Sequence, residues 1–160
     1  MVGVGLRVYS NSRVYYCIVE KNAGGIDIID NAFLDVPLAL DRPESLNFIR
    51  NTVLDVLRLY SVTNAVVRIS EMKLSGLKSY EVERIYIEGV IQEALAGCSV
   101  AKFKAGRINE LQKIGGFNNF KQLASGADVF PGFPSDEEWK NDLSLEQRES
   151  FLAAIISLNL

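Results

Sequence analysis

The chain has 160 residues, of which 48% are hydrophobic and 23% charged, and its formal net charge is −3. These values are typical of one soluble globular domain, and the acidic balance argues against broad non-specific nucleic-acid binding, which depends on positive charge. The chain has no His, which excludes Ser-His and Cys-His nucleophiles and His-ligated zinc or iron. The spacing of Cys17 and Cys98 does not indicate a disulfide framework, so we expect reduced thiols in a cytoplasmic protein. No apolar run reaches the ~18 residues of a membrane span or forms a signal peptide, so we expect no membrane attachment.

Three apolar runs near the N-terminus predict antiparallel strands. Residues 2–8 alternate between apolar and other side chains, residues 14–19 are rich in β-branched and aromatic types, and residues 26–38 form a third, irregular run. Gly3 and Gly5 leave one face of the first strand bare. A helix, a ligand or another backbone must therefore approach that strand closely.

Helices and strands alternate along the rest of the chain. Asp41 and Glu44 form a capping-box pattern before a helix that extends to residue 60, and Ser144 with Gln147 repeats the pattern before a final helix through Ile156. Between them the sequence predicts strands at 65–69 and 100–103, a helix at about 80–96 with Val82, Ile85 and Ile91 among its apolar positions, and short helices at 107–114 and 118–123. It also predicts a surface loop at 127–139, in which Trp139 with Phe130 and Phe133 covers the core or contacts a partner; the first is favoured.

The order of these elements predicts an α/β fold with one five-stranded mixed sheet flanked by helices. Its first three strands should be antiparallel, and its last two should run parallel through right-handed crossovers. We expect a single domain over residues 1–160, with a core of about 1–104 and a C-terminal helical extension of about 105–160.

This order, together with the segments 2–5, 65–71 and 144–156, resembles the RNase H-like superfamily and most of all its RuvC-type Holliday-junction resolvase branch. The resemblance implies a nuclease that holds two Mg²⁺ or Mn²⁺ ions with acidic residues. Those residues are expected in the middle of the first strand, after the fourth strand and on the last helix.

The sequence departs from that pattern at each of the three places. Gly5 stands where the first strand should carry a carboxylate, and Ser70 stands at the second place with Glu71 one residue later. On the last helix Ser150 occupies the expected position, with Glu149 and Glu146 nearby. Because glycine supplies no ligand, we expect no two-metal nuclease activity and no metal cofactor.

Three glutamates and several cations are candidate site residues. Glu71, Glu146 and Glu149 are candidate remnants of a metal site, although a solvated strand end and a helix N-terminus explain them as well. A phosphate-binding patch at the strand ends, or a set of separate surface charges, is expected from Arg7, Lys73, Lys78, Lys102, Lys104 and Arg107. Base stacking or ordinary strand packing is expected of Tyr9, Tyr15 and Tyr16.

These observations favour a catalytically inactive RNase H-like domain that acts as a binding or scaffold module. Its partner would be a protein, a second copy of the chain, or a nucleic acid bound without cleavage. The alternative is a Mg²⁺- or Mn²⁺-dependent nuclease with rearranged acids, using Glu71 and Glu149 with Glu146 or Asp142. A nucleotide-binding relative of the fold is disfavoured, because the turn at residues 10–12 is not a glycine-rich phosphate loop.

Overall fold

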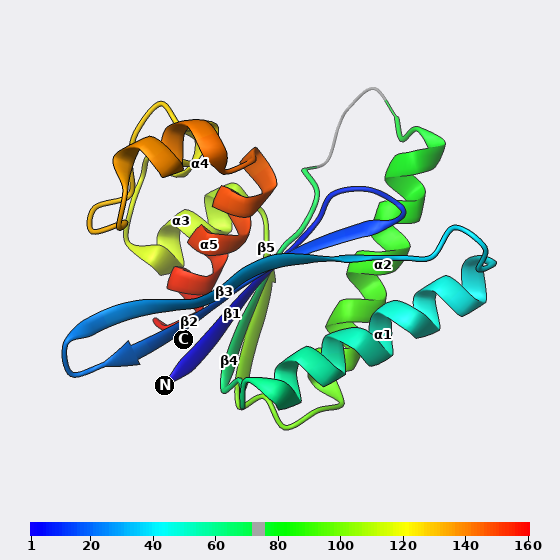
Figure 1. Ribbon diagram of the computed structural model, residues 1–160. Helices are drawn as coiled ribbons and strands as arrows, with labels where there is room; N and C mark the ends of the chain where they lie inside the picture. The colour runs from blue at the N-terminus through cyan, green and yellow to red at the C-terminus, as the bar shows by residue number, and fades with distance from the viewer. Residues whose placement is uncertain (72–75) are drawn as a thin grey trace.

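One mixed sheet of five strands forms the centre of the molecule (Figure 1). The computed structural model describes residues 1–71 and 76–160, so the candidate Lys73 lies outside the described residues. The strand order is β3-β2-β1-β4-β5, with β1 and β3 antiparallel to β2, and with β4 parallel to both β1 and β5. The strands are β1 (Val2–Val8), β2 (Arg13–Asn22), β3 (Gly25–Asp35), β4 (Asn64–Arg68) and β5 (Lys102–Gly106). The predicted fold class is confirmed.

Helices cover both faces of this sheet. The first face carries α1 (Arg42–Leu59) and α2 (Ser79–Ala96), and the other carries α3 (Ile108–Gly115), α4 (Phe120–Ser125) and α5 (Leu145–Ser157) (Figure 1). The strand period of two sends alternate side chains of β2 to opposite faces, so that Tyr16 and Ile18 join one hydrophobic core and Cys17 and Val19 join the other. The apolar side chains of β1 join only the core on the α1 and α2 face. Among the described residues, no helix has the length and apolar character needed to cross a lipid bilayer.

Local capping signals set the starts of two helices, as predicted. The Asp41 carboxylate accepts a hydrogen bond from the backbone N–H of Glu44 at 2.9 Å, and Glu44 accepts one from the Asp41 N–H at 3.0 Å. Ser144 and Gln147 exchange the equivalent bonds at the start of α5. Each pair satisfies backbone donors that the first helical turn leaves without partners.

The segment between α4 and α5 packs into the core on the α5 face. Trp139 lies in a π-helical turn (η1, Glu138–Asp142) and is fully buried, with its ring 4.8 Å from that of Phe133 and 5.4 Å from that of Phe151. Its indole N–H donates to the backbone oxygen of Asp128. The prediction that Trp139 covers the core is confirmed.

The bounds predicted for one strand were wrong. Strand β5 begins two residues after the predicted Val100 and continues to Gly106, because its parallel register pairs residues 102–106 with the whole of β4. Among the apolar positions predicted for α2, Ile91 is buried as part of the core, whereas Ile85 is 41% exposed.

Candidate functional site

The close approach predicted at the glycines of β1 is made by helix α5. A β-carbon on Gly5 would lie 2.8 Å from the backbone carbon of Ala153, and closer still to Ser150 O and Ala154 N. These are backbone atoms of a buried helix, which cannot turn aside as a side chain can. Gly5 therefore allows α5 to lie directly on the middle of β1.

Beneath the first half of α5, the same face of the sheet carries two buried arginines. Arg7 follows Gly5 by two residues in β1 and is paired in register with Arg68, the last residue of β4. Paired residues on neighbouring strands point to the same face, so the two guanidinium groups lie side by side. Both arginines are buried, with exposures of 7% and 3%.

Glu149, in the first half of α5, binds both of these arginines. Arg7 Nε donates to its Oε2, and Arg68 Nη2 lies 3.4 Å from its Oε1. Glu149 is itself 4% exposed. Burial lowers the pKa of Arg68, and the nearby Glu149 charge opposes that effect. A buried charge is tolerated only when it is paired and hydrogen-bonded, so the three groups depend on one another.

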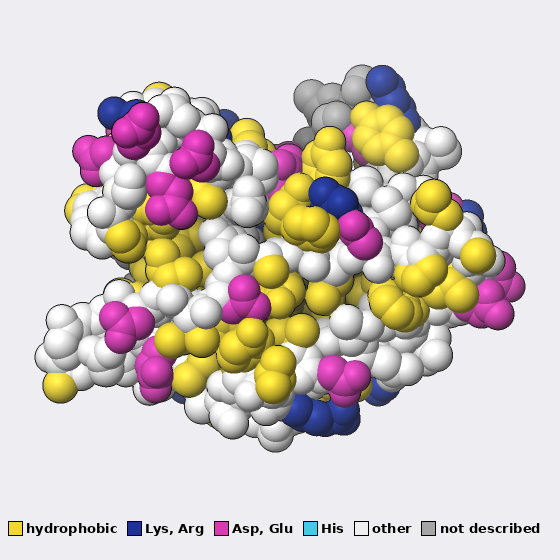
Figure 2. Space-filling model, in the orientation of Figure 1, with side chains coloured by type: hydrophobic (Ala, Val, Ile, Leu, Met, Phe, Trp, Pro, Cys, Tyr) yellow, Lys and Arg dark blue, Asp and Glu magenta, His cyan; other side chains and the backbone are white. Residues whose placement is uncertain are grey.

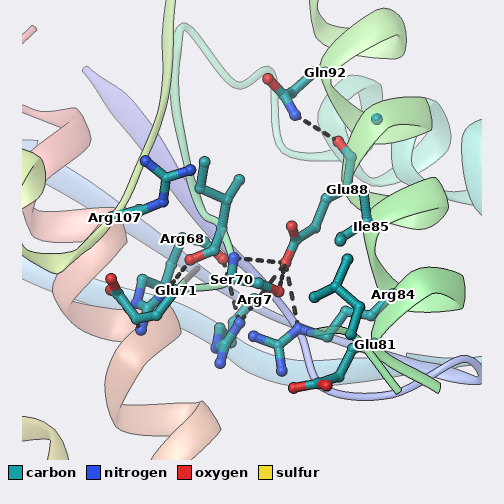
Figure 3. A pocket seen from close by; sticks show the side chains of 13 residues that line it. Arg7, Arg68, Ser70, Glu71, Glu81, Arg84, Ile85, Glu88, Gln92 and Arg107 are labelled. Carbon is teal, nitrogen blue, oxygen red and sulfur yellow. Dashed lines mark hydrogen bonds and ion pairs between the residues drawn. The ribbon is translucent and has the colours of Figure 1, made fainter. Parts of the chain in front are cut away.

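Glu88 of α2 forms the other half of this ion cluster. Its Oε1 accepts hydrogen bonds from the backbone N–H of Ser70 at 2.9 Å and from the Ser70 hydroxyl at 2.7 Å. Arg84 Nε lies 3.3 Å and Arg7 Nη1 3.9 Å from the same oxygen. Burial and then the Arg7 charge lower the pKa of Arg84. Figure 3 shows Arg7 and Arg68 between Glu71 on one side and Glu88 on the other.

Glu71 lies at the exposed rim of the cluster. Its Oε1 is 3.3 Å from Arg68 Nη2 and accepts a hydrogen bond from the backbone N–H of Ile108 at 3.1 Å. Glu71 and Glu149 therefore share one guanidinium nitrogen. The positive charge between the Glu71 and Glu149 carboxylates is therefore the Arg68 guanidinium.

The donor set does not fit the two-metal centre that the resemblance implies. The middle of β1 offers no side chain, and a carboxylate added at Gly5 would meet the backbone of α5. Glu149 and Glu88 are already bound by arginines, which would repel a metal cation. Within residues 1–71 and 76–160, no three His, Cys, Asp or Glu side chains are grouped so that they could hold a metal ion. We therefore assign no step to a metal.

The structure brings together only some of the predicted site residues. Glu71, Arg7 and Arg107 line one cavity, and Glu149 pairs with Arg7 beside it. Glu146 is half-buried and forms no part of the cluster. The remaining described cations are exposed and do not line this cavity: Lys78, Lys102 and Lys104. Asp142, a candidate of the alternative hypothesis, is exposed as well.

Sequence reasoning missed three members of the cluster: Arg68, Arg84 and Glu88. Arg68 appeared only as one residue of the strand predicted at 65–69, and Arg84 and Glu88 were not singled out. The i, i+4 spacing of Arg84 and Glu88 was available from the sequence, but such pairs are usually solvated. Their burial follows from where α2 lies beyond the ends of β1 and β4.

Solved structures with a similar fold match almost the whole chain. The chain is similar to Thermus thermophilus RuvC in complex with a Holliday junction substrate, with a TM-score of 0.72, 11% identity, and 99% of this chain and 94% of that chain covered. A second Thermus thermophilus RuvC structure has a TM-score of 0.67 and 12% identity, with 99% of this chain and 94% of that chain covered. The yeast mitochondrial Holliday junction resolvase Ydc2 has a TM-score of 0.62 and 11% identity, with 98% of this chain and 77% of that chain covered. Neither the protein-family models nor the curated proteins give a significant match. The chain has the RuvC-type form of the RNase H-like fold.

Proposed function

We propose that this chain is a binding module on a RuvC-type fold, and that it binds nucleic acid without cleaving it. The observation that carries the absence of cleavage is the packing of α5 on Gly5, which leaves no place for a carboxylate at the middle of β1. The arginine pairing of Glu149 and Glu88 supports it, because both carboxylates are already neutralised by fixed cations.

A row of aromatic and cationic residues supports nucleic acid as the ligand. In register across the sheet, Phe33 pairs with Tyr15, and Tyr15 pairs with Arg7. The Arg13 guanidinium lies 4.0 Å from the centre of the Phe33 ring, and the Tyr9 ring packs edge-on against Tyr15. Tyr9 and Phe33 are about half exposed, at 51% and 46%, whereas Tyr15 and Arg7 are buried. The accessible part of the row is therefore Tyr9, Phe33 and Arg13.

Exposed rings next to guanidinium groups are the means by which proteins stack unpaired bases. Figure 2 shows hydrophobic side chains gathered over the sheet edge that carries β3, beside basic and acidic ones. Thermus thermophilus RuvC, which has the same fold, forms a complex with a Holliday junction substrate, and a four-way DNA junction is therefore one ligand to test.

The test separates binding from cleavage. Fluorescence anisotropy with a labelled four-way DNA junction and a labelled single strand measures binding, and denaturing gels with Mg²⁺ or Mn²⁺ measure cleavage of the same substrates. We expect binding without cleavage. Phe33→Ala should weaken binding at least about fivefold, because stacking one base contributes roughly 1–3 kcal/mol.

Leu59→Ala is the matched control, since Leu59 is an apolar residue at the end of α1 that is more accessible than Phe33, at 73% against 46% exposed. Its binding should stay within twofold of the wild type. Cleavage that Glu71→Gln or Glu149→Gln abolishes would establish the rearranged nuclease instead. Binding to neither substrate would overturn the choice of nucleic acid.

A protein partner or a second copy of the chain is the second candidate. Apolar side chains are exposed on α2, where Tyr80 is 50% and Tyr86 46% exposed, and in the segment before α1, where Leu38 is 95% exposed. Ordinary surfaces carry scattered apolar residues, but a continuous patch marks an interface. Light scattering after size exclusion tests self-association: a dimer that Tyr86→Glu dissociates would support this candidate, and a monomer at high concentration would remove the self-association form of it.

A further inference from the structure

A cavity of about 550 Å³ lies where β1 and β4 end, between α2 and the start of α3. Four arginines line it: Arg7, Arg68, Arg84 and Arg107. The space-filling view shows the molecule notched between the C-terminal helices and the far end of α2 (Figure 2). This volume is within the range of pockets that hold organic ligands, about 300–1,000 Å³.

Two guanidinium groups in this cavity have donors without acceptors. Arg68 Nε and Arg107 Nε are buried, and neither has a hydrogen-bond partner among the described residues. Arg68 is only 3% exposed as a whole. A buried donor without an acceptor costs roughly 1–3 kcal/mol, so these two atoms favour a ligand that brings acceptor oxygens.

Arg107 differs from the other three arginines. Arg7, Arg68 and Arg84 are each within 4 Å of a carboxylate oxygen of Glu149 or Glu88. For the Arg107 guanidinium, the described part of the chain provides no such partner, and Figure 3 shows it apart from the network of dashed contacts. Arg107 is therefore the cation that remains available to an incoming anion.

The α2 side of the cavity has an apolar part beside the charged side chains of Glu81, Arg84 and Glu88. Ile85 and Leu77 line it although they are 41% and 53% exposed, and Gly89 lies between them and Gln92. A β-carbon on Gly89 would meet no atom within 4 Å, so the wall is open at that residue. A ligand with an anionic end and a flat or apolar body would bury both kinds of surface.

We propose that this cavity binds a phosphomonoester carried on an apolar or planar group, such as a nucleoside 5′-monophosphate. Its phosphate lies against Arg107 and Arg68, and its body lies against Ile85 and Leu77. A phosphomonoester presents three terminal oxygens, which suits donors from two separate guanidinium groups better than the two oxygens of a carboxylate do. Cation binding is disfavoured here by the arginines themselves.

The inference does not depend on the proposed function, because it concerns a small ligand and involves neither junction binding nor cleavage. Isothermal titration of the wild-type chain with adenosine 5′-monophosphate, adenosine, inorganic phosphate and citrate tests the chemistry. We expect the monophosphate to bind at one site, adenosine not to bind, and inorganic phosphate to bind at least tenfold more weakly. Equal affinity for adenosine or for citrate would overturn the proposal.

Arg107→Ala should weaken adenosine 5′-monophosphate at least tenfold, and Arg107→Lys should restore only part of the loss because Lys lacks the planar fork. Lys104→Ala is the matched control: it removes an exposed positive charge three residues away, outside the cavity, and should change affinity less than twofold. If Arg107→Ala and Lys104→Ala lower the affinity equally, the nucleotide is held by general charge attraction, and the proposed site is overturned. Circular dichroism should show both variants folded, since neither residue is part of the buried ion cluster.

A further pair of probes tests whether the phosphate belongs to a free nucleotide or to the 5′ end of a nucleic-acid strand. An oligonucleotide with a 5′-phosphate is compared with the same strand ending in a 5′-hydroxyl. A higher affinity for the 5′-phosphate strand that is lost in Arg107→Ala supports a strand end as the source. Binding of the mononucleotide, with equal affinity for the two strands, supports a free nucleotide as the source. No binding of the mononucleotide, together with equal affinity for the two strands, overturns recognition of a terminal phosphate, whereas strand binding that depends on Phe33 would persist.

Discussion

Replacing Gly5 by alanine tests the packing of α5 on the sheet. The added β-carbon would lie 2.8 Å from the backbone carbon of Ala153 and nearer to Ser150 O and Ala154 N, where ordinary van der Waals contact begins at 3.4 Å. Because all three are backbone atoms, either α5 or β1 must move. Overpacking of this kind typically costs 1–3 kcal/mol and occasionally more, and a clash with rigid backbone belongs at the upper end, at about 3 kcal/mol.

Urea unfolding followed by tryptophan fluorescence measures this cost directly. Trp139 is the only tryptophan and packs against Phe151 of α5, so its emission reports the core that the substitution disturbs. In thermal unfolding, a loss of about 3 kcal/mol lowers the midpoint by about 6–12 °C for a chain of this size. Gly5→Asp should be at least as unstable and should gain no nuclease activity.

Gly89→Ala is the control for the loss of a glycine. Gly89 lies inside α2 with no atom within 4 Å of an added β-carbon, so alanine should stabilise the chain by about 0.5–1 kcal/mol. A Gly5→Ala chain within 1 kcal/mol of the wild type would refute the close packing of α5. It would also reopen the middle of β1 to an acidic side chain.

The buried ion cluster, the cysteines and a buried tyrosine give three further predictions. Arg7→Met should cost about 3–5 kcal/mol in urea unfolding because Glu149 loses a partner, whereas the double variant with Glu149→Leu should cost less than that single one. Burial raises the pKa of the Cys17 thiol, so a thiol reagent at pH 8 should modify the partly exposed Cys98 first and Cys17 only after unfolding. Burial and a hydrogen bond to a carboxylate raise the pKa of Tyr16, so its contribution to stability is complete below about pH 10, the pKa of an unfolded tyrosine, and is lost as pH rises above that value.

Each of these has a contradicting result. Additive costs in the Arg7 and Glu149 double-mutant cycle would show that the two side chains do not interact. Equal modification rates of the two cysteines in the native chain would contradict the burial of Cys17. For Tyr16, the check is unfolding across pH 8 to 11: a Tyr16→Phe variant that loses stability as steeply as the wild type would assign the effect elsewhere.

Patterns within single elements were enough to predict most of the fold. The capping boxes at Asp41 and Ser144 set helix starts, and the bare face made by Gly3 and Gly5 predicted a close approach. What approaches could not be predicted, because α5 is about 140 residues away along the chain and its place depends on the whole topology. The shift of β5 has the same cause, since its ends are set by pairing with β4.

The candidate site was less accessible to sequence reasoning. Glu149 was interpreted as a residue near a helix N-terminus, because no local signal shows that two strand ends place Arg7 and Arg68 beneath it. The sequence distinguishes a buried glutamate from a solvated one only when its partners are neighbours in the chain. Glu88 has such a neighbour in Arg84, but its bonds to Ser70 decide its burial and lie 18 residues away.

Manganese binding to the wild-type chain, measured by electron paramagnetic resonance, tests the central claim most directly. With α5 on Gly5, and with Glu149 held by Arg7 and Arg68, the spectrum should be that of free Mn²⁺ at every protein concentration. Stoichiometric Mn²⁺ binding that Glu149→Gln abolishes would contradict the account, because a cation would then displace the arginines and occupy the site they fill.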